Sequence, residues 1–406
     1  MVRLLTSITL SAVLLVSNTA AHPGDHHSDI SHLERERAFH RRAAEAGALK
    51  MGRCADTLGT VRKSGIKRRT TTLERLRQER GFASSAGIQP RNKEEVAYYD
   101  SLNHNLTSVV KSGSYEELFG SNASCVLGRA ETIGPYYVEG ELIRSNITED
   151  QIGIPMHMEL QFVDVNTCKP VPALFIDIWG ANATGGYSGA ESPAGISGFG
   201  GLNSTFLRGI QITDEHGVAS FDLIVPGHYY PRATHTHIVA WGNATTFPNA
   251  NNFKGTIAGG LATDDTFIRY VGQLYYEQKL RDAVDPIWPY NTNTDKDNFK
   301  NVDDYILAEN KTLNGNTAGD LGAYDPFVKY AYFTDDLTDG IFAWHTIGVD
   351  MGDNFNGGFQ AAAKYEEDGG RALNAWGDGT INPYPAVVPP KGIVSTTAAG
   401  SSATGL

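Results

Sequence analysis

The 406-residue sequence has only 3 cysteines and, after its first residues, no uninterrupted apolar run of membrane-spanning length. A membrane-spanning helix needs about 20 predominantly apolar residues, so we predict no membrane partner. Positive charge is also scarce, because 34 lysines and arginines stand against 46 aspartates and glutamates. The formal charge of −12 argues against nucleic acid and anionic membranes as partners.

An apolar run does occur at the very start of the chain, from Leu4 to Val16, and it leads into the small residues that end at Ala21. This pattern is typical of a cleaved secretory signal and is too short for a membrane anchor. We therefore predict a signal peptide over residues 1–21 and a secreted, extracellular mature protein that begins near His22. Seven Asn-x-Ser/Thr sequons agree with a glycosylating export pathway, at Asn105, Asn122, Asn146, Asn182, Asn203, Asn243 and Asn310.

In an oxidising compartment, three cysteines favour one disulfide with one cysteine left over. Cys125 and Cys168 flank the predicted core, so we expect these two to pair. Such a bridge would contribute about 3–4 kcal/mol through loop closure. Cys54 lies in a basic N-terminal region and is expected to pair between chains or to stay free.

Residues 22–120 form that basic region, which we predict to be partly helical. Helix-like runs include Ser31 to Ala46 and Thr71 to Arg80. The dibasic sequences Arg41-Arg42 and Lys67-Arg68-Arg69 are possible cleavage sites for a secretory protease, and common surface features as well. Whether this region is removed stays open.

Residues 121–355 carry the period-2 alternation of β-strands, and residues 356–406 form a Gly-, Ala-, Pro- and Ser-rich tail without core-forming periodicity. Short strands joined by Gly- and Asn-rich connections favour an antiparallel sandwich over a parallel α/β sheet. We predict an all-β fold, an antiparallel β-sandwich core with a helical N-terminal extension and a disordered C-terminal tail. The predicted strands include Met158 to Val165, Leu174 to Trp179, Phe206 to Thr213, Val218 to Val225 and His235 to Trp241.

A pair of histidines begins the last of these strands. His235 and His237 are two residues apart, so they project from one face of the strand. Cupins, zinc hydratases and copper sandwiches all use such a pair as half of a metal site. A cupin needs a glutamate soon afterwards, yet the next one is Glu277. The nearby side chains are phenols instead, Tyr229 just before the pair and Tyr187 after another predicted strand.

Together with their neighbours, these residues resemble the signature of the intradiol ring-cleavage dioxygenases, most closely the extracellular fungal branch. The likeness covers roughly Ser124 to Asp350. The matching segments are Gly134-Pro135-Tyr136-Tyr137, Ile178-Trp179, Gly185-Gly186-Tyr187-Ser188, Pro226-Gly227-His228-Tyr229, Arg232, and His235 with His237.

The resemblance implies a mononuclear iron(III) whose ligands are Tyr187, Tyr229, His235 and His237. It also implies that Arg232 is the active-site arginine and that Tyr229 leaves the iron when substrate binds and acts as a base. Iron(III) is hard and highly charged, so it can deprotonate a phenol whose free pKa is about 10. The family commonly has Pro-Gly-Arg after the tyrosine, whereas this chain has Tyr230-Pro231-Arg232. Tyr230 is thus an alternative ligand, although the spacing to Arg232 favours Tyr229.

The implied activity is cleavage of catechol-type rings between the two hydroxyl-bearing carbons, with both atoms of O2 entering a cis,cis-muconate-type product. The expected partners are a small-molecule catechol-type substrate and O2, with a possible homodimer, and no organic cofactor is required. One alternative is a secreted copper oxidase that uses the N-terminal His22. Another is a non-catalytic β-sandwich binding module, which predicts that one or more of the four ligands is missing.

Other residues near the motifs carry weaker signals. Gln273, at the start of a predicted strand, and Trp179 are interpreted as structural. Tyr136 fits packing on the sandwich as well as a place in the substrate pocket. His216 and His345 lack metal-ligand spacing and are interpreted as structural or surface residues.

Overall fold

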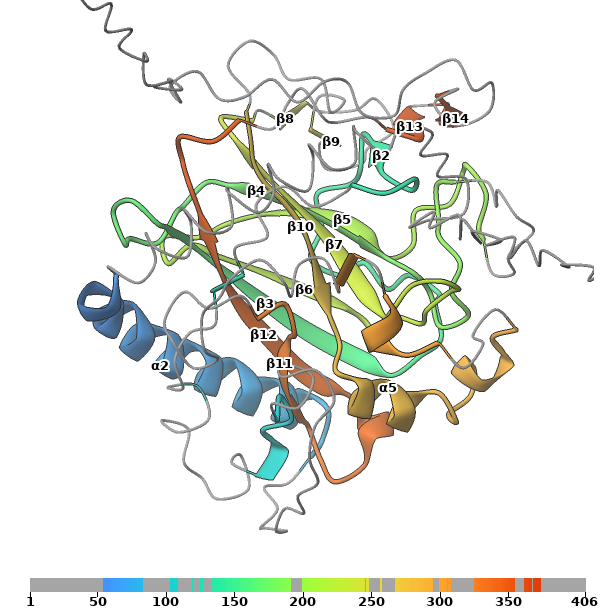
Figure 1. Ribbon diagram of the computed structural model, residues 1–406, viewed down its shortest axis with the longest axis horizontal. Coiled ribbons are helices and arrows are strands. Elements are labelled where there is room, and N and C mark those ends of the chain that lie inside the picture. Colours follow the sequence, from blue (N-terminus) through green and yellow to red (C-terminus); the bar gives the residue numbers. More distant parts are fainter. Residues whose placement is uncertain are drawn as a thin grey trace, which may run out of the picture.

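Two facing β-sheets and one long helix form the body of the protein, as a computed structural model shows (Figure 1). The all-β sandwich predicted from the sequence is confirmed. The structure describes residues 54–82, 103–108, 119, 125–126, 133–190, 199–244, 246–247, 256–257, 267–294, 299–304, 306–307, 325–354, 361–366 and 368–373. The predicted signal peptide, His22 and most of the C-terminal tail lie outside these residues. Within the predicted tail, Ala363–Glu366 and Gly369–Ala372 form a pair of antiparallel strands, so the prediction of a disordered tail is wrong for this segment.

The first sheet has the order β1-β12-β3-β6, with β11 also paired to β12. β3 and β6 are antiparallel, but β12 runs parallel to β3, with Ile341 opposite Met156. The sandwich is therefore not antiparallel throughout. Between β3 and β12 the chain builds the whole second sheet, and only such a long connection can return a strand in the same direction. The strands are β1 (Cys125–Val126), β3 (Pro155–Asp164), β6 (Val218–Ile224), β11 (Lys329–Tyr332) and β12 (Ile341–Val349).

The second sheet is antiparallel, with the order β10-β7-β4-β5. Its central strand β7 begins at His235, as the sequence predicts. The strands are β4 (Phe175–Gly180), β5 (Arg208–Ile212), β7 (His235–Gly242) and β10 (Phe267–Tyr275). Smaller elements are β2 (Val138–Glu139), β8 (Thr246–Phe247), β9 (Thr256–Ile257), β13 (Ala363–Glu366), β14 (Gly369–Ala372), α5 (Gln278–Val284), η1 (Tyr290–Thr292), η2 (Asn301–Asp303) and η3 (Leu337–Asp339).

The two faces of the second sheet have different roles. Ile178 and Ile238 belong to the apolar core shared with the first sheet, where they join Met158 and Leu160 of β3. Because side chains alternate along a strand, their neighbours Trp179 and His237 point to the opposite face. That outer face holds a second cluster of buried aromatic residues. It also carries the candidate site.

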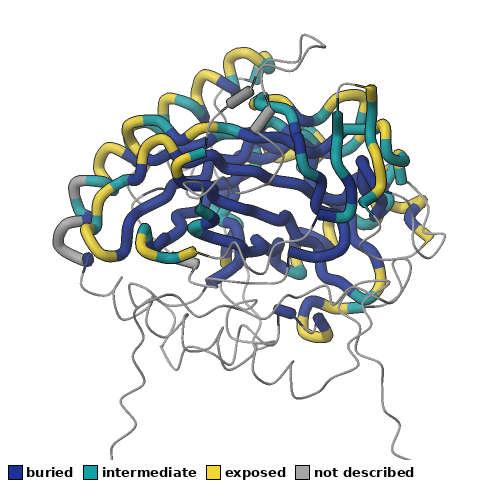
Figure 2. Tube along the Cα trace, turned by 90° about the horizontal axis from the view of Figure 1, so that it is seen from above, coloured by how far each residue is buried: buried dark blue, intermediate teal, exposed yellow. Residues whose placement is uncertain are grey.

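Helix α2 (Ala55–Glu79) packs on the outer face of the first sheet (Figure 1). Leu73 and Leu76 lie in one cluster with Phe342 and Trp344 of β12. The other side of the helix carries the exposed residues, which appear yellow in Figure 2. The helix predicted over Thr71 to Arg80 is confirmed and extends further towards the N-terminus, whereas the run from Ser31 to Ala46 lies outside the described residues.

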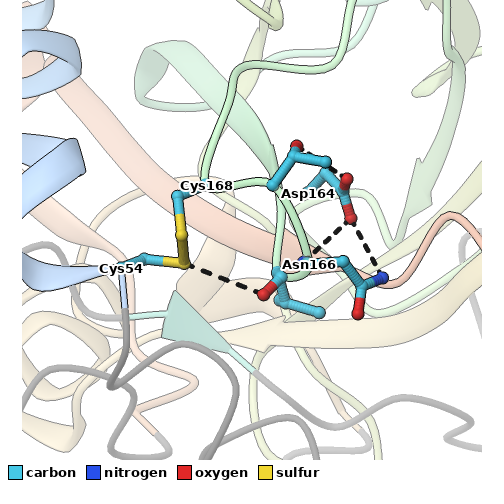
Figure 3. The surroundings of a disulfide bond; sticks show 6 residues. Cys54, Asp164, Asn166 and Cys168 are labelled. Carbon is cyan, nitrogen blue, oxygen red and sulfur yellow. Dashed lines mark hydrogen bonds between the residues drawn. A yellow bond between two sulfur atoms is a disulfide. The ribbon is translucent and has the colours of Figure 1, made fainter.

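A disulfide joins the start of α2 to the turn after β3 (Figure 3). It links Cys54 with Cys168, whose Cα atoms lie 5.2 Å apart, across 114 residues of sequence. The expected pairing of Cys125 with Cys168 is therefore wrong, and so is the expectation that Cys54 is free or pairs between chains. The sequence separates Cys54 from the core, but the packing of α2 on β3 brings it to Cys168. Cys125 lies in β1, outside this pair.

Two helix arginines bind one buried glutamate of the sheet. Glu159 Oε1 accepts from Arg68 Nη2 at 2.8 Å and from Arg69 Nε at 2.6 Å. The dibasic sequence Lys67-Arg68-Arg69 thus lies in the middle of a helix that is held by ion pairs and by a disulfide. Among the described residues, no helix is both long enough and apolar enough to cross a membrane.

Candidate metal centre

The four predicted ligands come together on the outer face of the second sheet. His235 and His237 begin β7, Tyr187 follows β4, and Tyr229 lies between β6 and β7. All four side chains are buried. Tyr187 Oη lies 3.3 Å from His235 Nε2, and the Nε2 atoms of the two histidines are 3.1 Å apart. The ring of Tyr229 lies 5.9 Å from that of Tyr187 and 5.9 Å from that of His235.

The two consecutive tyrosines point in different directions. Tyr229 is buried beside the histidines, whereas Tyr230 is 50% exposed and contacts Phe299 edge-on at 5.7 Å. The peptide bond between Tyr230 and Pro231 is cis. Of the two alternatives that the sequence leaves open, the geometry favours Tyr229.

His235 is held in the tautomer that a metal needs. Its Nδ1 lies 2.7 Å from the carbonyl oxygen of Ala233, which can only accept, so Nδ1 carries the hydrogen. The lone pair then resides on Nε2, the atom that faces His237 and Tyr187. Burial, together with the nearby charge of Arg232, holds the pKa of His235 well below its usual range. A neutral imidazole with a free lone pair is the form that binds metals.

Both phenols are favoured in the neutral form as long as no metal ion is bound beside them. Burial raises the pKa of Tyr187 to about 12 and that of Tyr229 well above its usual range. Among the described residues, no group of three or more His, Cys, Asp or Glu side chains is arranged to hold a metal. The donors that do converge are two imidazole nitrogens and two phenol oxygens. This set fits iron(III), because a hard trivalent cation offsets the cost of buried phenolates.

Arg232 lies beside the histidines and is fixed at several atoms. Its Nε donates to Asp304 Oδ2 at 2.9 Å, and its Nη2 donates to Tyr275 Oη at 3.0 Å and to Gln273 Oε1. Its Nη1 lies 3.5 Å from His235 Nε2. Burial alone would lower the pKa of Arg232, but Asp304 and the surrounding phenols raise it overall. The guanidinium is thus a permanent positive charge next to the site.

The sequence interpretation did not assign a role at the site to three partners of Arg232, which are Gln273, Tyr275 and Asp304. Gln273, interpreted as structural, pairs with His237 across β7 and β10, and Tyr275 pairs with His235. A sequence-level pairing of these two strands would have found both residues. Asp304 follows the short η2 helix and had no local signal, because its contact with Arg232 spans 72 residues.

Aromatic rings enclose the donor set. Tyr136 stacks on Tyr187 with ring centroids 4.5 Å apart and meets Tyr229 edge-on at 6.0 Å. Trp179 stacks on His237 at 4.8 Å, and Tyr137 packs on Trp179 at 5.1 Å. Tyr136 is therefore both a packing residue and a neighbour of the site. Of the two histidines that the sequence interpretation set aside, His216 is exposed in a turn and His345 is buried in β12, and neither joins the site.

Imidazole and phenol donors that converge in a buried part of a β-sandwich form a donor set that could bind a single metal ion. Residues 133–287 match the family model described as Dioxygenase, the family of intradiol ring-cleavage enzymes. This stretch, which contains all four predicted ligands and Arg232, belongs to the intradiol ring-cleavage dioxygenase family. The predicted resemblance is thereby confirmed, and the assignment to the fungal branch stays a prediction. No curated protein sequence matches the chain.

Several solved structures are similar. An intradiol ring-cleavage dioxygenase from Tetranychus urticae is 24% identical with a TM-score of 0.40, covering 56% of this chain and 94% of that one. A 3-chlorocatechol 1,2-dioxygenase from Rhodococcus opacus is 14% identical with a TM-score of 0.31, covering 59% and 75%. The dioxygenase domain of a dioxygenase carbohydrate-binding protein fusion from a Streptomyces species is 20% identical with a TM-score of 0.29, covering 55% and 97%.

Proposed function

We propose that this chain is a secreted non-haem iron(III) dioxygenase that cleaves catechol-type rings between the two hydroxyl-bearing carbons. Both atoms of O2 enter the product, a cis,cis-muconate-type dicarboxylic acid, so no external reductant is consumed. The observation that carries the proposal is the convergence of two histidines and two tyrosines inside the family-matched region. Tyr187, Tyr229, His235 and His237 would hold the iron.

When bound, the iron(III) would supply a Lewis acid that both catechol oxygens can coordinate and that makes the ring reactive towards O2. The rest of the chemistry falls to the protein. As the phenolate that a bound iron(III) would hold, Tyr229 could take a proton on its Oη from a substrate hydroxyl, because burial raises the pKa of its phenol and so favours the protonated form. Arg232, fixed by Asp304, would stabilise negative charge that develops on the substrate. Tyr136 and Trp179, whose rings stack on Tyr187 and His237, would help to exclude water from the metal ligands.

The expected substrates are catechols or hydroxyquinols derived from lignin or plant phenolics, and a homodimer is compatible with the proposal. Export is supported by the signal-like sequence of residues 1–21, by the sequons and by the Cys54–Cys168 bridge. The binding-module alternative predicted that a ligand would be missing, yet all four are present and adjacent. The copper alternative depends on His22, which lies outside the described residues.

The test is the visible spectrum of the purified iron-loaded protein, recorded before and after anaerobic addition of catechol. We expect a red-brown tyrosinate-to-iron band that shifts when catechol binds. Tyr187→Phe should weaken the band, and Tyr230→Phe, a change at the exposed neighbour of Tyr229, should leave it intact. A protein that stays colourless after iron(III) loading would refute the proposal.

A further inference from the structure

Asn182 lies between β4 and Tyr187, and its side chain fixes the loop that carries this tyrosine. The carboxamide Oδ1 accepts from the backbone N–H of Thr184 at 3.1 Å and from that of Gly186 at 3.1 Å. It also accepts from the hydroxyl of Thr184 at 3.0 Å. Gly186 immediately precedes Tyr187. One oxygen atom thus organises the loop up to this predicted ligand.

The backbone of Asn182 extends the connection to the segment that carries Tyr229. Its carbonyl oxygen accepts from Gly185 N–H at 3.0 Å and from Gly227 N–H at 3.1 Å. Its own N–H donates to the Gly186 carbonyl at 2.8 Å. Gly227 lies two residues before Tyr229. The same residue is therefore hydrogen-bonded to both tyrosine-bearing segments.

Glycines let these segments touch backbone to backbone. A Cβ atom added to Gly227 would lie 2.5 Å from the carbonyl oxygens of both Asn182 and Ala183. A Cβ added to Gly185, whose φ is +88°, would lie 2.5 Å from the carbonyl oxygen of His228. Such distances mean that the two segments lie in direct backbone contact at both glycines. A displacement of Asn182 would shift both tyrosines.

Asn182 is also a sequon, because Ala183 and Thr184 follow it. It differs from other sequons in its surroundings. Asn182 is only 9% exposed, whereas among the other described sequons Asn105 is half-buried and Asn146, Asn203 and Asn243 are exposed. A glycan requires an accessible carboxamide in a surface segment. The buried carboxamide of Asn182 is instead engaged inside the loop.

We propose that Asn182 is a positioning residue that sets the spacing of Tyr187 and Tyr229, and that it carries no glycan although it stands in a sequon. The consequence for iron binding rests on the proposed function. The coupling of the two segments and the absence of a glycan do not rest on it.

The first measurement is hydrogen–deuterium exchange of the metal-free protein, resolved over the segments that contain Gly186 and Gly227. Asn182→Ala should make both segments exchange about tenfold faster. The bond from Gly186 N–H to the carboxamide is lost, and the bond from Gly227 N–H to the Asn182 carbonyl oxygen is loosened as the loop relaxes. Asn182→Asp keeps the accepting oxygens and should restore much of the protection. Asn146→Ala is the matched control, because Asn146 Oδ1 also accepts from an N–H two residues on, that of Thr148 at 3.0 Å, but on an exposed segment.

The second measurement maps glycans after enzymatic deglycosylation in heavy-oxygen water, which marks each formerly glycosylated asparagine. In protein made by a glycosylating host, Asn182 should be unmarked. Either a mark at Asn182, or unchanged exchange at both segments in Asn182→Ala, overturns the proposal.

The third measurement is the tyrosinate-to-iron band of the iron-loaded variants. Asn182→Ala should shift and weaken it, and Asn146→Ala should not. If the wild-type protein binds no iron but its exchange depends on Asn182, the proposed function fails while the coupling of the segments stands. If the iron band is present and Asn182→Ala leaves both it and the exchange unchanged, the positioning role fails alone.

Discussion

Trp179 lies flat against the imidazole of His237, with ring centroids 4.8 Å apart and ring planes 2° apart. The two residues are paired across β4 and β7, so the sheet itself sets this stacking. A rigid indole on one side of the imidazole limits its rotation about χ2. The residue interpreted as simple core from the sequence thus orients a predicted ligand.

Replacing Trp179 should therefore affect both stability and metal binding. Trp179→Ala leaves a buried cavity and should lower the free energy of unfolding by about 3–5 kcal/mol. Urea unfolding measures this loss, and iron stoichiometry should fall because His237 is no longer held. Trp288→Ala is the control, since Trp288 is 61% exposed and its removal should cost no more than about 0.5 kcal/mol. Equal losses in the two variants would contradict the prediction.

Arg232 should not tolerate replacement by lysine. The lysine keeps the charge but cannot bind Asp304, Tyr275 and Gln273 at once through a planar fork. If the arginine stabilises developing charge, kcat should fall by about 10²–10³-fold in Arg232→Lys. Steady-state oxygen uptake with catechol measures this effect, and Arg75→Lys on the exposed side of α2 serves as the control. A kcat within twofold of wild type would argue against the role.

The bridge between Cys54 and Cys168 should stabilise the fold strongly. It closes a loop of 114 residues in sequence separation, for which loop-closure entropy gives about 4–5 kcal/mol. Cys54→Ala should lower the urea midpoint accordingly, and a reductant should lower that of the wild-type protein alone. Cys125→Ala, outside the pair, should change little. If Cys125 were paired with Cys168 instead, Cys125→Ala would lower the urea midpoint and Cys54→Ala would change it little.

Glu159 should be essential for the docking of α2. Glu159→Gln removes the carboxylate that Arg68 and Arg69 share, and breaking a buried ion pair from one side costs about 3–5 kcal/mol. Glu79→Gln tests an exposed ion pair with Arg75 on the same helix and should cost no more than about 0.5 kcal/mol. Thermal unfolding compares the two variants. Limited proteolysis at Lys67-Arg68-Arg69 should accelerate only in Glu159→Gln.

Stability should decline at alkaline pH because of one buried histidine. His104 Nδ1 lies 3.2 Å from Glu277 Oε2, and its Nε2 lies 3.2 Å from Asp325 Oδ1. Burial alone would lower the pKa of His104, but these carboxylates raise it from 6.5 to about 9. The folded state thus holds the proton more tightly than the unfolded state.

This difference in proton affinity sets the direction of the pH dependence. The contribution of His104 to the free energy of unfolding is fully present below the unfolded pKa of about 6.5 and is lost as the pH rises through about 9. The free energy of unfolding, measured in urea at intervals from about pH 6 to about pH 10, should show this decline. In His104→Gln the decline should flatten, although the variant is less stable at neutral pH. A wild-type curve as flat as that of the variant would contradict the assignment.

The sequence by itself determined the alternating strands and the residues of the site. Period-2 patterns located β3, β4 and β7, because one face of each strand must be apolar in a sandwich. The His-x-His pair and the tyrosine motifs are short sequence patterns. Their residues could therefore be identified without any knowledge of the fold. The five residues predicted at the site, Tyr187, Tyr229, Arg232, His235 and His237, accordingly lie together.

The tertiary structure alone decided what depends on contacts distant in sequence. Cys54 meets Cys168 only because α2 packs on β3, and Asp304 meets Arg232 only because the chain returns to the site after β10. The parallel pairing of β12 with β3 is likewise invisible in local patterns. Only the burial of the side chains distinguishes Tyr229 from the exposed Tyr230 as a candidate ligand. Burial likewise distinguishes the sequon at Asn182 from the exposed sequons. Alternation and spacing are properties of neighbouring residues, whereas these pairings are set by how whole elements pack.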